Sequence, residues 1–75
     1  MLEYELLGII DGVATYQYYP EGDRENPGTI RFDSNFKMID YALSKQDEFA
    51  RYVVKLFHWF KRKGRFIETG FIAWG

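Results

Sequence analysis

Apolar and acidic residues alternate at the start of the chain, in the order Leu-Glu-Tyr-Glu-Leu over residues 2–6. This two-residue period is typical of a strand with one buried face, and it predicts a strand over residues 2–10. Asp11 and Gly12 follow, and both residue types tolerate the positive φ angles of a tight hairpin turn. The sequence therefore predicts an antiparallel hairpin whose second strand covers residues 13–19.

A polar loop separates this hairpin from a third expected strand over residues 29–33. Pro27 and Gly28 in that loop fit the central positions of a type II turn, in which the glycine takes positive φ. Residues 36–43 fit either a fourth strand or the beginning of a helix, because their apolar residues also have helical spacing. We prefer the strand, since Ser44 is a better helix start than any residue upstream.

The segment SKQDEFARYVVKLFHWFKRKG, residues 44–64, has the pattern of one amphipathic helix. Ser44 and Asp47 match a capping box at its start, and Gly64 suits a left-handed cap at its end. Cationic residues occupy the last turn, where the helix dipole favours them. The apolar side chains that we expect to face the core are Phe49, Val53, Leu56, Phe57 and Phe60.

The tail is also apolar, and we expect residues 71–74 to form a short final strand or to pack across the sheet. The expected fold is α+β: an antiparallel meander of about four strands, one helix packed on one face, and a short C-terminal strand. All of it forms a single domain of residues 1–75.

One helix covers only one face of a sheet, and the first hairpin offers apolar residues to both faces. Straight pairing across the turn places Tyr16 and Tyr18 on one face and Tyr4 and Leu6 on the other. Either face fits under the helix, and a bulge at Gly8 would change this register. We therefore expect an apolar second face that is available for binding.

Composition excludes several kinds of site. The chain has no cysteine and one histidine, so disulfides, thiolate metal sites and multi-histidine sites are excluded. The start lacks the basic residues and apolar run of a signal peptide, and no stretch approaches the roughly 20 apolar residues that cross a bilayer. We expect a cytoplasmic protein that makes no membrane contact.

The net charge of −1 conceals an uneven distribution. Residues 1–50 hold ten acids and four bases, whereas residues 51–75 hold one acid and six bases. Such a split is typical of a binding face, or of two halves that attract each other.

The expected helix carries a basic stripe beside Trp59, on the flank away from its apolar stripe. We favour a solvated helix face as its interpretation, because nucleic-acid-binding domains usually show an overall basic bias. The functional alternative is an anion-binding face for nucleic acid or for an acidic protein. The candidate residues for that role are Arg51, Lys55, Arg62, Lys63 and Arg65.

The second expected strand has three tyrosines within four positions. On an open sheet face such side chains stack nucleic-acid bases or contact a partner. We favour core and boundary packing, because the charges of this half are mostly acidic and a base-stacking face needs cations. The candidate interaction surface consists of Tyr16, Tyr18, Tyr19 and Trp74.

Catalytic chemistry has little support in the sequence. His58 has no nucleophile or orienting acid at a suggestive spacing, and we favour a surface or boundary histidine. The alternating acids at positions 21, 23 and 25 lack the closing bidentate glutamate of a calcium loop. We expect no catalytic residue, no metal site and no cofactor.

Four segments, YYPEG, PGTIRFD, DEFARY and IAWG, resemble a family of small uncharacterised proteins of Gram-positive bacteria and their mobile elements. The resemblance covers most of residues 16–75 and departs at the turn DSN, where the family has a longer turn ending in Gly. It implies the same order of elements and a bacterial cytoplasmic setting, and it transfers no activity, cofactor or site residue.

Two functions stay open. The first is a non-enzymatic protein-interaction module that binds a partner protein, or a second copy of itself, through the helix-free sheet face or the edge of the last strand. The alternative is a nucleic-acid-binding protein that uses the basic helix face. An enzyme is the least favoured, because no set of polar residues converges in the sequence.

Overall fold

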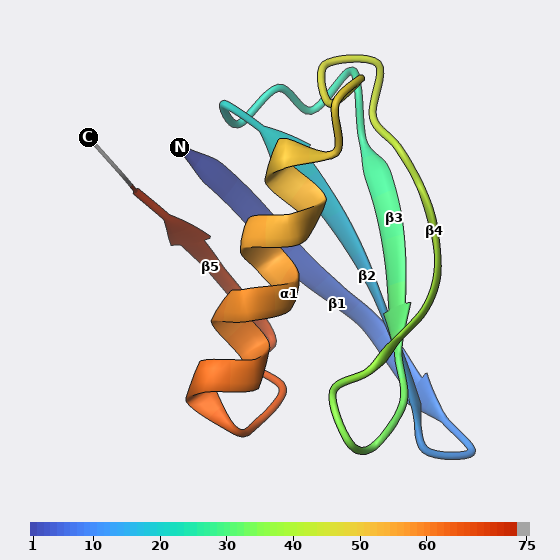
Figure 1. Cartoon of the computed structure of the whole chain (residues 1–75). Coiled ribbons are helices and arrows are strands. Elements are labelled where there is room, and N and C mark those ends of the chain that lie inside the picture. The colour runs from blue at the N-terminus through green and yellow to red at the C-terminus, as the bar shows by residue number, and fades with distance from the viewer. Residues whose placement is uncertain (74–75) are drawn as a thin grey trace.

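The computed structural model describes residues 1–73, which form one antiparallel sheet with a helix on one face (Figure 1). The strands lie side by side in the order β4-β3-β2-β1-β5. The α+β fold is confirmed, and residues 36–43 contain a strand. The elements are β1 (Leu2–Ile10), β2 (Val13–Pro20), β3 (Gly28–Phe32), β4 (Met38–Ala42), α1 (Arg51–Lys63) and β5 (Thr69–Ile72).

The turn between β1 and β2 forms as the sequence predicts. Asp11 has φ 51° and Gly12 has φ 77°, the left-handed conformation that a two-residue hairpin requires at both positions. Leu7 of β1, on the N-terminal side of this turn, is an extra residue. The pairing register between β1 and β2 therefore shifts by one residue between Gly8 and Leu6.

This β-bulge decides which side chains share a face. Beyond Leu7, Leu6 pairs with Tyr16 and Tyr4 pairs with Tyr18. Directly paired residues point to the same face of a sheet. Our expectation that Tyr4 and Leu6 lie opposite to Tyr16 and Tyr18 is therefore wrong, and the bulge near Gly8 is the reason.

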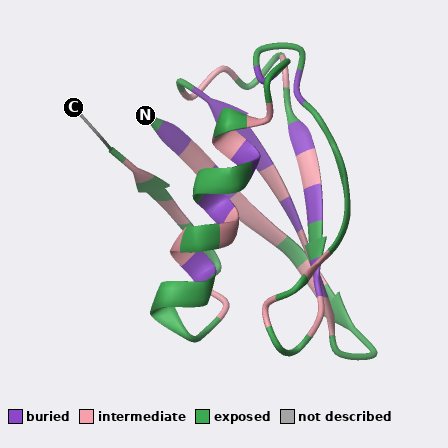
Figure 2. Cartoon of the chain, viewed as in Figure 1, coloured by how far each residue is buried: buried purple, intermediate pink, exposed green. Residues whose placement is uncertain are grey.

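One face of the sheet is consequently apolar and lies under α1. Buried residues gather on β2, β3, the first half of β1 and α1, whereas β4 is mostly exposed (Figure 2). The core side chains are Leu2, Tyr4, Ala14, Tyr16, Tyr18, Ile30, Phe32, Val53, Leu56 and Phe60.

The helix-free face is polar, so the prediction of an apolar second face is wrong. Its large apolar residues by register are Tyr19 and Phe71, with Ile10 and Val13 at the hairpin end. The polar residues that the pairing places there are Glu3, Glu5, Thr15, Gln17, Thr29, Arg31, Asp40 and Thr69.

Gly28 lies in β3 under the ring of Tyr18. A Cβ atom at this position would lie 2.3 Å from Cε1 of that ring, so only glycine leaves room for the aromatic side chain. Gly28 is not among the glycines with positive φ. The predicted type II turn is therefore wrong, and the glycine serves packing instead.

The helix begins at Arg51 rather than next to Ser44. Residues 44–50 form two consecutive turns, in which the N–H of Asp47 donates to the carbonyl of Ser44 and the N–H of Ala50 to that of Asp47. Phe49 lies before the helix and is 75% exposed, so its predicted place in the core is wrong. The predicted helix end is confirmed at Gly64.

The start of α1 is capped from a distance. Ala50, the residue before the helix, has φ 57° and offers no side-chain hydrogen bond. The carboxylate of Asp47 instead accepts the N–H groups of Tyr52 at 3.0 Å and Val53 at 3.1 Å. It also accepts the Tyr18 hydroxyl at 2.7 Å, which ties the helix start to β2.

Candidate anion-binding groove

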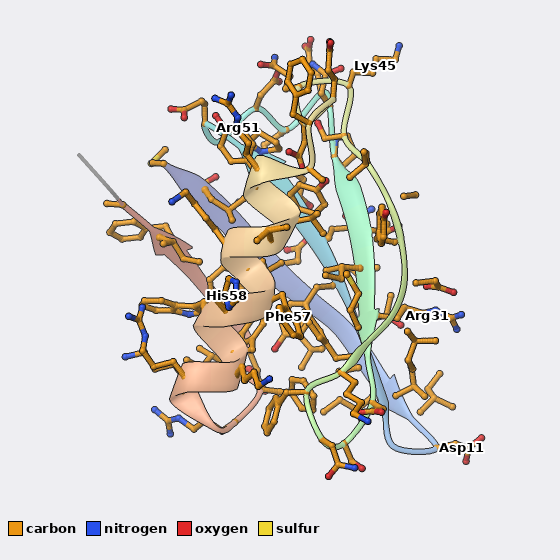
Figure 3. All side chains as sticks on the ribbon, viewed as in Figure 1. Asp11, Arg31, Lys45, Arg51, Phe57 and His58 are labelled. Carbon is orange, nitrogen blue, oxygen red and sulfur yellow. The ribbon has the colours of Figure 1, made fainter. Side chains whose placement is uncertain are left out.

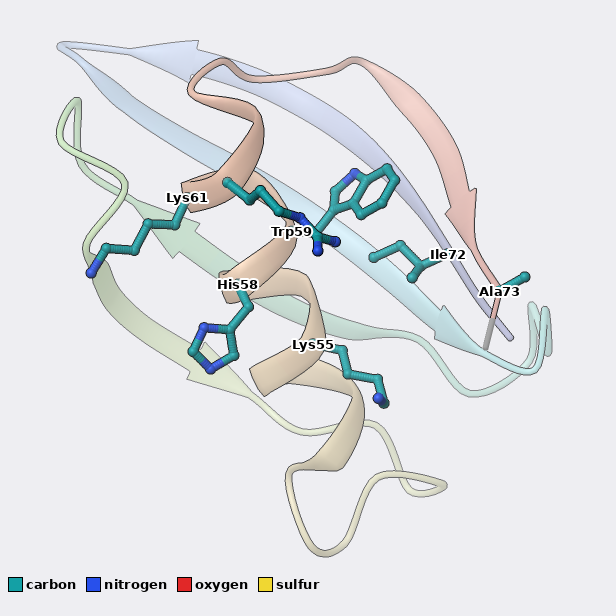
Figure 4. Close-up of a pocket in the computed structure, with 7 residues that line it drawn as sticks. Lys55, His58, Trp59, Lys61, Ile72 and Ala73 are labelled. Carbon is teal, nitrogen blue, oxygen red and sulfur yellow. The ribbon is translucent and has the colours of Figure 1, made fainter. Parts of the chain in front are cut away.

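A groove of about 560 Å³ lies between α1 and the sheet edge formed by β5 (Figure 4). The helix supplies most of its wall, and the end of β5 supplies the opposite side. The lining residues are Lys55, His58, Trp59, Lys61, Arg62, Ile72 and Ala73.

The indole of Trp59 is held over this edge of the sheet. Its Nε1–H donates to the hydroxyl of Tyr4 at 3.0 Å. Tyr4 pairs with Gly70 of β5, and a Cβ atom on Gly70 would lie 2.6 Å from the Tyr4 oxygen. The missing side chain of Gly70 thus lets the phenol reach across β5, where it fixes the position of Trp59.

Cations gather around this indole. The guanidinium carbon of Arg62 lies 5.7 Å from the Trp59 ring centroid, and the ammonium nitrogen of Lys63 lies 4.7 Å from it. Both distances fall within the range of cation–π attraction. Lys55 is one turn earlier on the same flank as Trp59 (Figure 4). The flank facing β5 therefore combines three positive charges with an aromatic surface.

The other two polar residues of the lining point elsewhere. Lys61 and His58 lie on the opposite side of the helix from Trp59 (Figure 4). The ammonium nitrogen of Lys61 lies 5.5 Å from the ring centroid of Phe57, which is also on that side. We therefore define the cationic flank as Lys55, Trp59, Arg62 and Lys63.

The structure separates the five candidate anion-binding residues into three places. Lys55, Arg62 and Lys63 belong to the cationic flank. Arg51 lies at the start of α1 (Figure 3), in a second hollow that Lys55 also lines, and the Arg51 guanidinium carbon is 5.8 Å from the Phe49 ring centroid. Arg65 lines a third hollow after the helix end.

Sequence reasoning noted Trp59 beside the basic stripe but did not include it among the site residues. It also missed Ile72 and Ala73, which reach the groove only because β5 pairs with β1. The apolar tail was the available signal, since it predicted a final strand, but it did not identify the strand's neighbour.

The tyrosines of β2 do not form an interaction surface, and that candidate role is wrong for them. Tyr16 and Tyr18 are fully buried, because the bulge directs them under α1. Tyr19 is 5% exposed, and the guanidinium carbon of Arg24 lies 4.0 Å from its ring centroid. Trp74, the fourth residue of that candidate surface, lies outside the described residues.

Burial also shapes the acid–base chemistry of these phenols. The hydroxyl of Tyr16 donates to the carbonyl of Ile67 at 2.8 Å, and that of Tyr18 donates to Asp47. Burial raises the pKa of Tyr16 and of Tyr18 well above the usual value. For Tyr18 the hydrogen bond to the carboxylate raises the pKa further.

The groove lies beside an open strand edge. Within residues 1–73, β5 pairs only with β1. The backbone N–H and C=O groups on the outer side of such a strand are free to pair with another extended chain. Among the same residues, no three His, Cys, Asp or Glu side chains are placed to hold a metal ion.

Comparison with known proteins found no matching family model, no matching curated protein and no matching solved structure. Over the described part of the chain, no helix is both long and apolar enough to cross a membrane.

Proposed function

We propose that this chain is a non-enzymatic protein-interaction module that binds an acidic, extended segment of a partner protein along β5. The observation that supports it is the position of the cationic flank next to an open strand edge. We also propose a cytoplasmic location, which the absence of cysteine favours.

The edge of β5 supplies backbone recognition. An extended peptide that adds a sixth strand there forms main-chain hydrogen bonds with the outward groups of Thr69–Ile72. Successive side chains of the added strand alternate between the two faces of the sheet. Every second side chain therefore points to the helix side, toward the cationic flank.

The spacing of the cationic flank specifies the peptide. Lys55 and Arg62 are seven residues apart, which is about 10 Å along a helix at 1.5 Å per residue. Side chains at positions k and k+4 of a strand are about 13 Å apart. Flexible Lys and Arg side chains absorb the difference between this spacing and that along the helix. The matching segment has acids at k and k+4 and an apolar residue at k+2, opposite Trp59 and Ile72.

Two features favour a protein over a nucleic acid as the partner. Strand addition uses the peptide backbone, which nucleic acid lacks. The net charge of −1 also gives the whole chain no long-range attraction for a polyanion. Nucleic acid is the competing outcome of the test.

The test is a titration of ¹⁵N-labelled protein, followed by NMR. The ligand is a decapeptide with Glu at positions k and k+4 and Val at position k+2. The residues that alternate with these three are Thr. We expect the largest shifts at the Trp59 indole N–H and at the amides of Thr69–Ile72. A peptide with both Glu replaced by Lys is the ligand control.

A matched pair of variants tests the charges. Arg62→Glu reverses a charge in the cationic flank. Lys45→Glu makes the same change in net charge on the turn that precedes the helix (Figure 3). We expect at least about fivefold weaker binding for Arg62→Glu, roughly 1 kcal/mol, and no change for Lys45→Glu.

Two results would overturn the proposal. One is the absence of shifts at β5 with the acidic peptide. The other is a salt-reversible response of the cationic flank to a mixed-sequence single-stranded oligonucleotide alone, which would establish the nucleic-acid function instead.

A further inference from the structure

The other edge of the sheet has a different character. Tyr41 of β4 pairs with Ile30, which in turn pairs with Tyr16, so the three side chains form one row on the helix-covered face. Tyr16 and Ile30 are fully buried, whereas Tyr41 is 50% exposed. The cover provided by α1 therefore ends between β3 and β4, and the helix side of β4 is open.

More apolar residues continue this open strip. Ile39, the extra residue of a bulge in β4, and Leu43, which directly follows the strand, are 46% and 39% exposed. On α1, Phe57 stacks with Phe32 of β3 at a centroid distance of 6.5 Å, which identifies the flank of the helix that faces this edge. We define the β4 rim as Ile39, Tyr41 and Leu43.

The β4 strand itself is uncharged in effect, and Lys61 is a cation on the helix flank that faces it. Asp40 is the one charged residue within Met38–Ala42, and it lies on the other face, paired with Arg31 of β3. The Arg31 Nε–H donates to one Asp40 oxygen at 2.8 Å, and an Nη2–H donates to the other. Edge strands that stay single usually carry Lys, Pro or a β-bulge to block pairing. Within β4 neither Lys nor Pro is present, and the bulge at Ile39 leaves residues 40–42 as the regular stretch that can pair.

We propose that β4 is a self-association edge, at which two copies of this chain pair antiparallel and join their sheets. Charge favours a second copy as the occupant, because a strand whose only charge is neutralised within its own chain does not repel itself. Two-fold symmetry also brings each apolar rim onto the same apolar rim of the partner. This interface is separate from the β5 groove and does not depend on the proposed function.

The symmetry closes the assembly. Pairing β4 with β4 uses both apolar edges and leaves the two β5 edges at the outer ends of a continuous sheet. Pairing β4 with β5 would instead leave free edges that grow into a fibre. The charged side chains beside β5 oppose that arrangement, since it would bring the apolar β4 rim against them.

The interface that a stable dimer needs is large for a chain of this size. A stable dimer takes about 600–1,000 Å² of surface from each partner. That range is about an eighth to a fifth of the 4860 Å² surface of one chain. Small domains that cannot build a large core commonly gain stability by association.

The experiment is sedimentation equilibrium of the full chain from about 10 µM to 1 mM. We expect the mass to rise from 9.0 kDa toward twice that value. Tyr41→Lys places a charge on the rim and should hold the chain as a monomer at all concentrations. Ile10→Lys, at the exposed hairpin end of β1, is the matched control and should dimerise like the wild type.

Hydrogen exchange of the wild type avoids any effect of substitution on folding. Amide protection in Met38–Ala42 should increase with protein concentration, while that in Thr69–Ile72 should not. A monomer at 1 mM, a Tyr41→Lys variant that still dimerises, or growth into larger species would each overturn the proposal. Concentration-dependent protection at β5 alone would assign the contact to the opposite edge.

Discussion

Asp47 is the side chain on which the junction between helix and sheet depends. Asp47 is 2% exposed, and its carboxylate accepts three hydrogen bonds, from Tyr18, Tyr52 and Val53. Asp47→Ala removes all three acceptor contacts at once. The two N–H groups lose their cap, and the phenol of Tyr18 loses its acceptor inside the core.

The expected loss of stability combines two costs. Loss of a helix N-cap costs about 0.5–2 kcal/mol, and a buried hydroxyl without its acceptor costs about 1–3 kcal/mol. We expect a decrease of about 2–4 kcal/mol in the free energy of unfolding. A chain of 75 residues has roughly 4–11 kcal/mol in total, so Asp47→Ala should remove a large fraction of it and lower Tm by about 10–25 °C.

Urea unfolding followed by circular dichroism measures this loss, with Glu48→Ala as the neighbouring exposed control. Tyr18→Phe and the double variant complete a thermodynamic cycle. Because Phe has no hydroxyl to leave unpaired, the cost of Asp47→Ala should fall by about 1 kcal/mol in that background. A cost for Asp47→Ala within about 0.5 kcal/mol of that for Glu48→Ala would refute this account of the junction.

Two further predictions concern the buried tyrosines. Gly28→Ala should destabilise the fold by about 1–3 kcal/mol, because the new methyl overlaps the Tyr18 ring, whereas Gly8→Ala meets nothing within 4 Å and is the control in the same unfolding assay. Because the pKa of Tyr16 and Tyr18 is raised in the folded state, the unfolded chain loses these two protons at lower pH than the folded chain does. The contribution of both phenols to the free energy of unfolding is therefore fully present below about pH 10. Above that pH it falls by up to about 1.4 kcal/mol per pH unit for each phenol. Thermal unfolding between pH 8 and 11.5 checks this, and a Tm that stays constant across the range would contradict it.

The strands were predictable because their signals are local. Alternation over residues 2–6 and the Asp11-Gly12 turn depend only on neighbouring residues, and so does the glycine that ends α1. The start of the helix was not predictable in the same way. The Ser44 pattern was a plausible local cap, but the carboxylate that caps α1 is held by Tyr18, 29 residues earlier in the chain.

The faces of the sheet depend on one inserted residue. β1 and β2 each show a clear alternation, but the phase between them changes at Leu7. Without the bulge, Tyr4 and Leu6 would lie on the polar face, away from the helix. Burying both under α1 removes a large apolar area from water, so the register with the extra residue is the stable one. Gly8 indicated a bulge in the sequence, but it did not show which side chains the bulge would place under the helix.

That single shift also determines where the chain can bind. Because the bulge directs Tyr4 and Leu6 to the same side as Tyr16 and Tyr18, the helix-free face is mostly polar and offers no broad apolar patch. Unpaired backbone then occurs at the two sheet edges, one beside the cationic flank and one beside the β4 rim. Lys55 and Arg62 were identifiable by spacing, but only pairing with β1 places β5 next to them. Since three cations flank the β5 edge and β4 itself is apolar with its one charge paired within the chain, we expect the two edges to select different partners, an acidic strand at β5 and a second copy at β4.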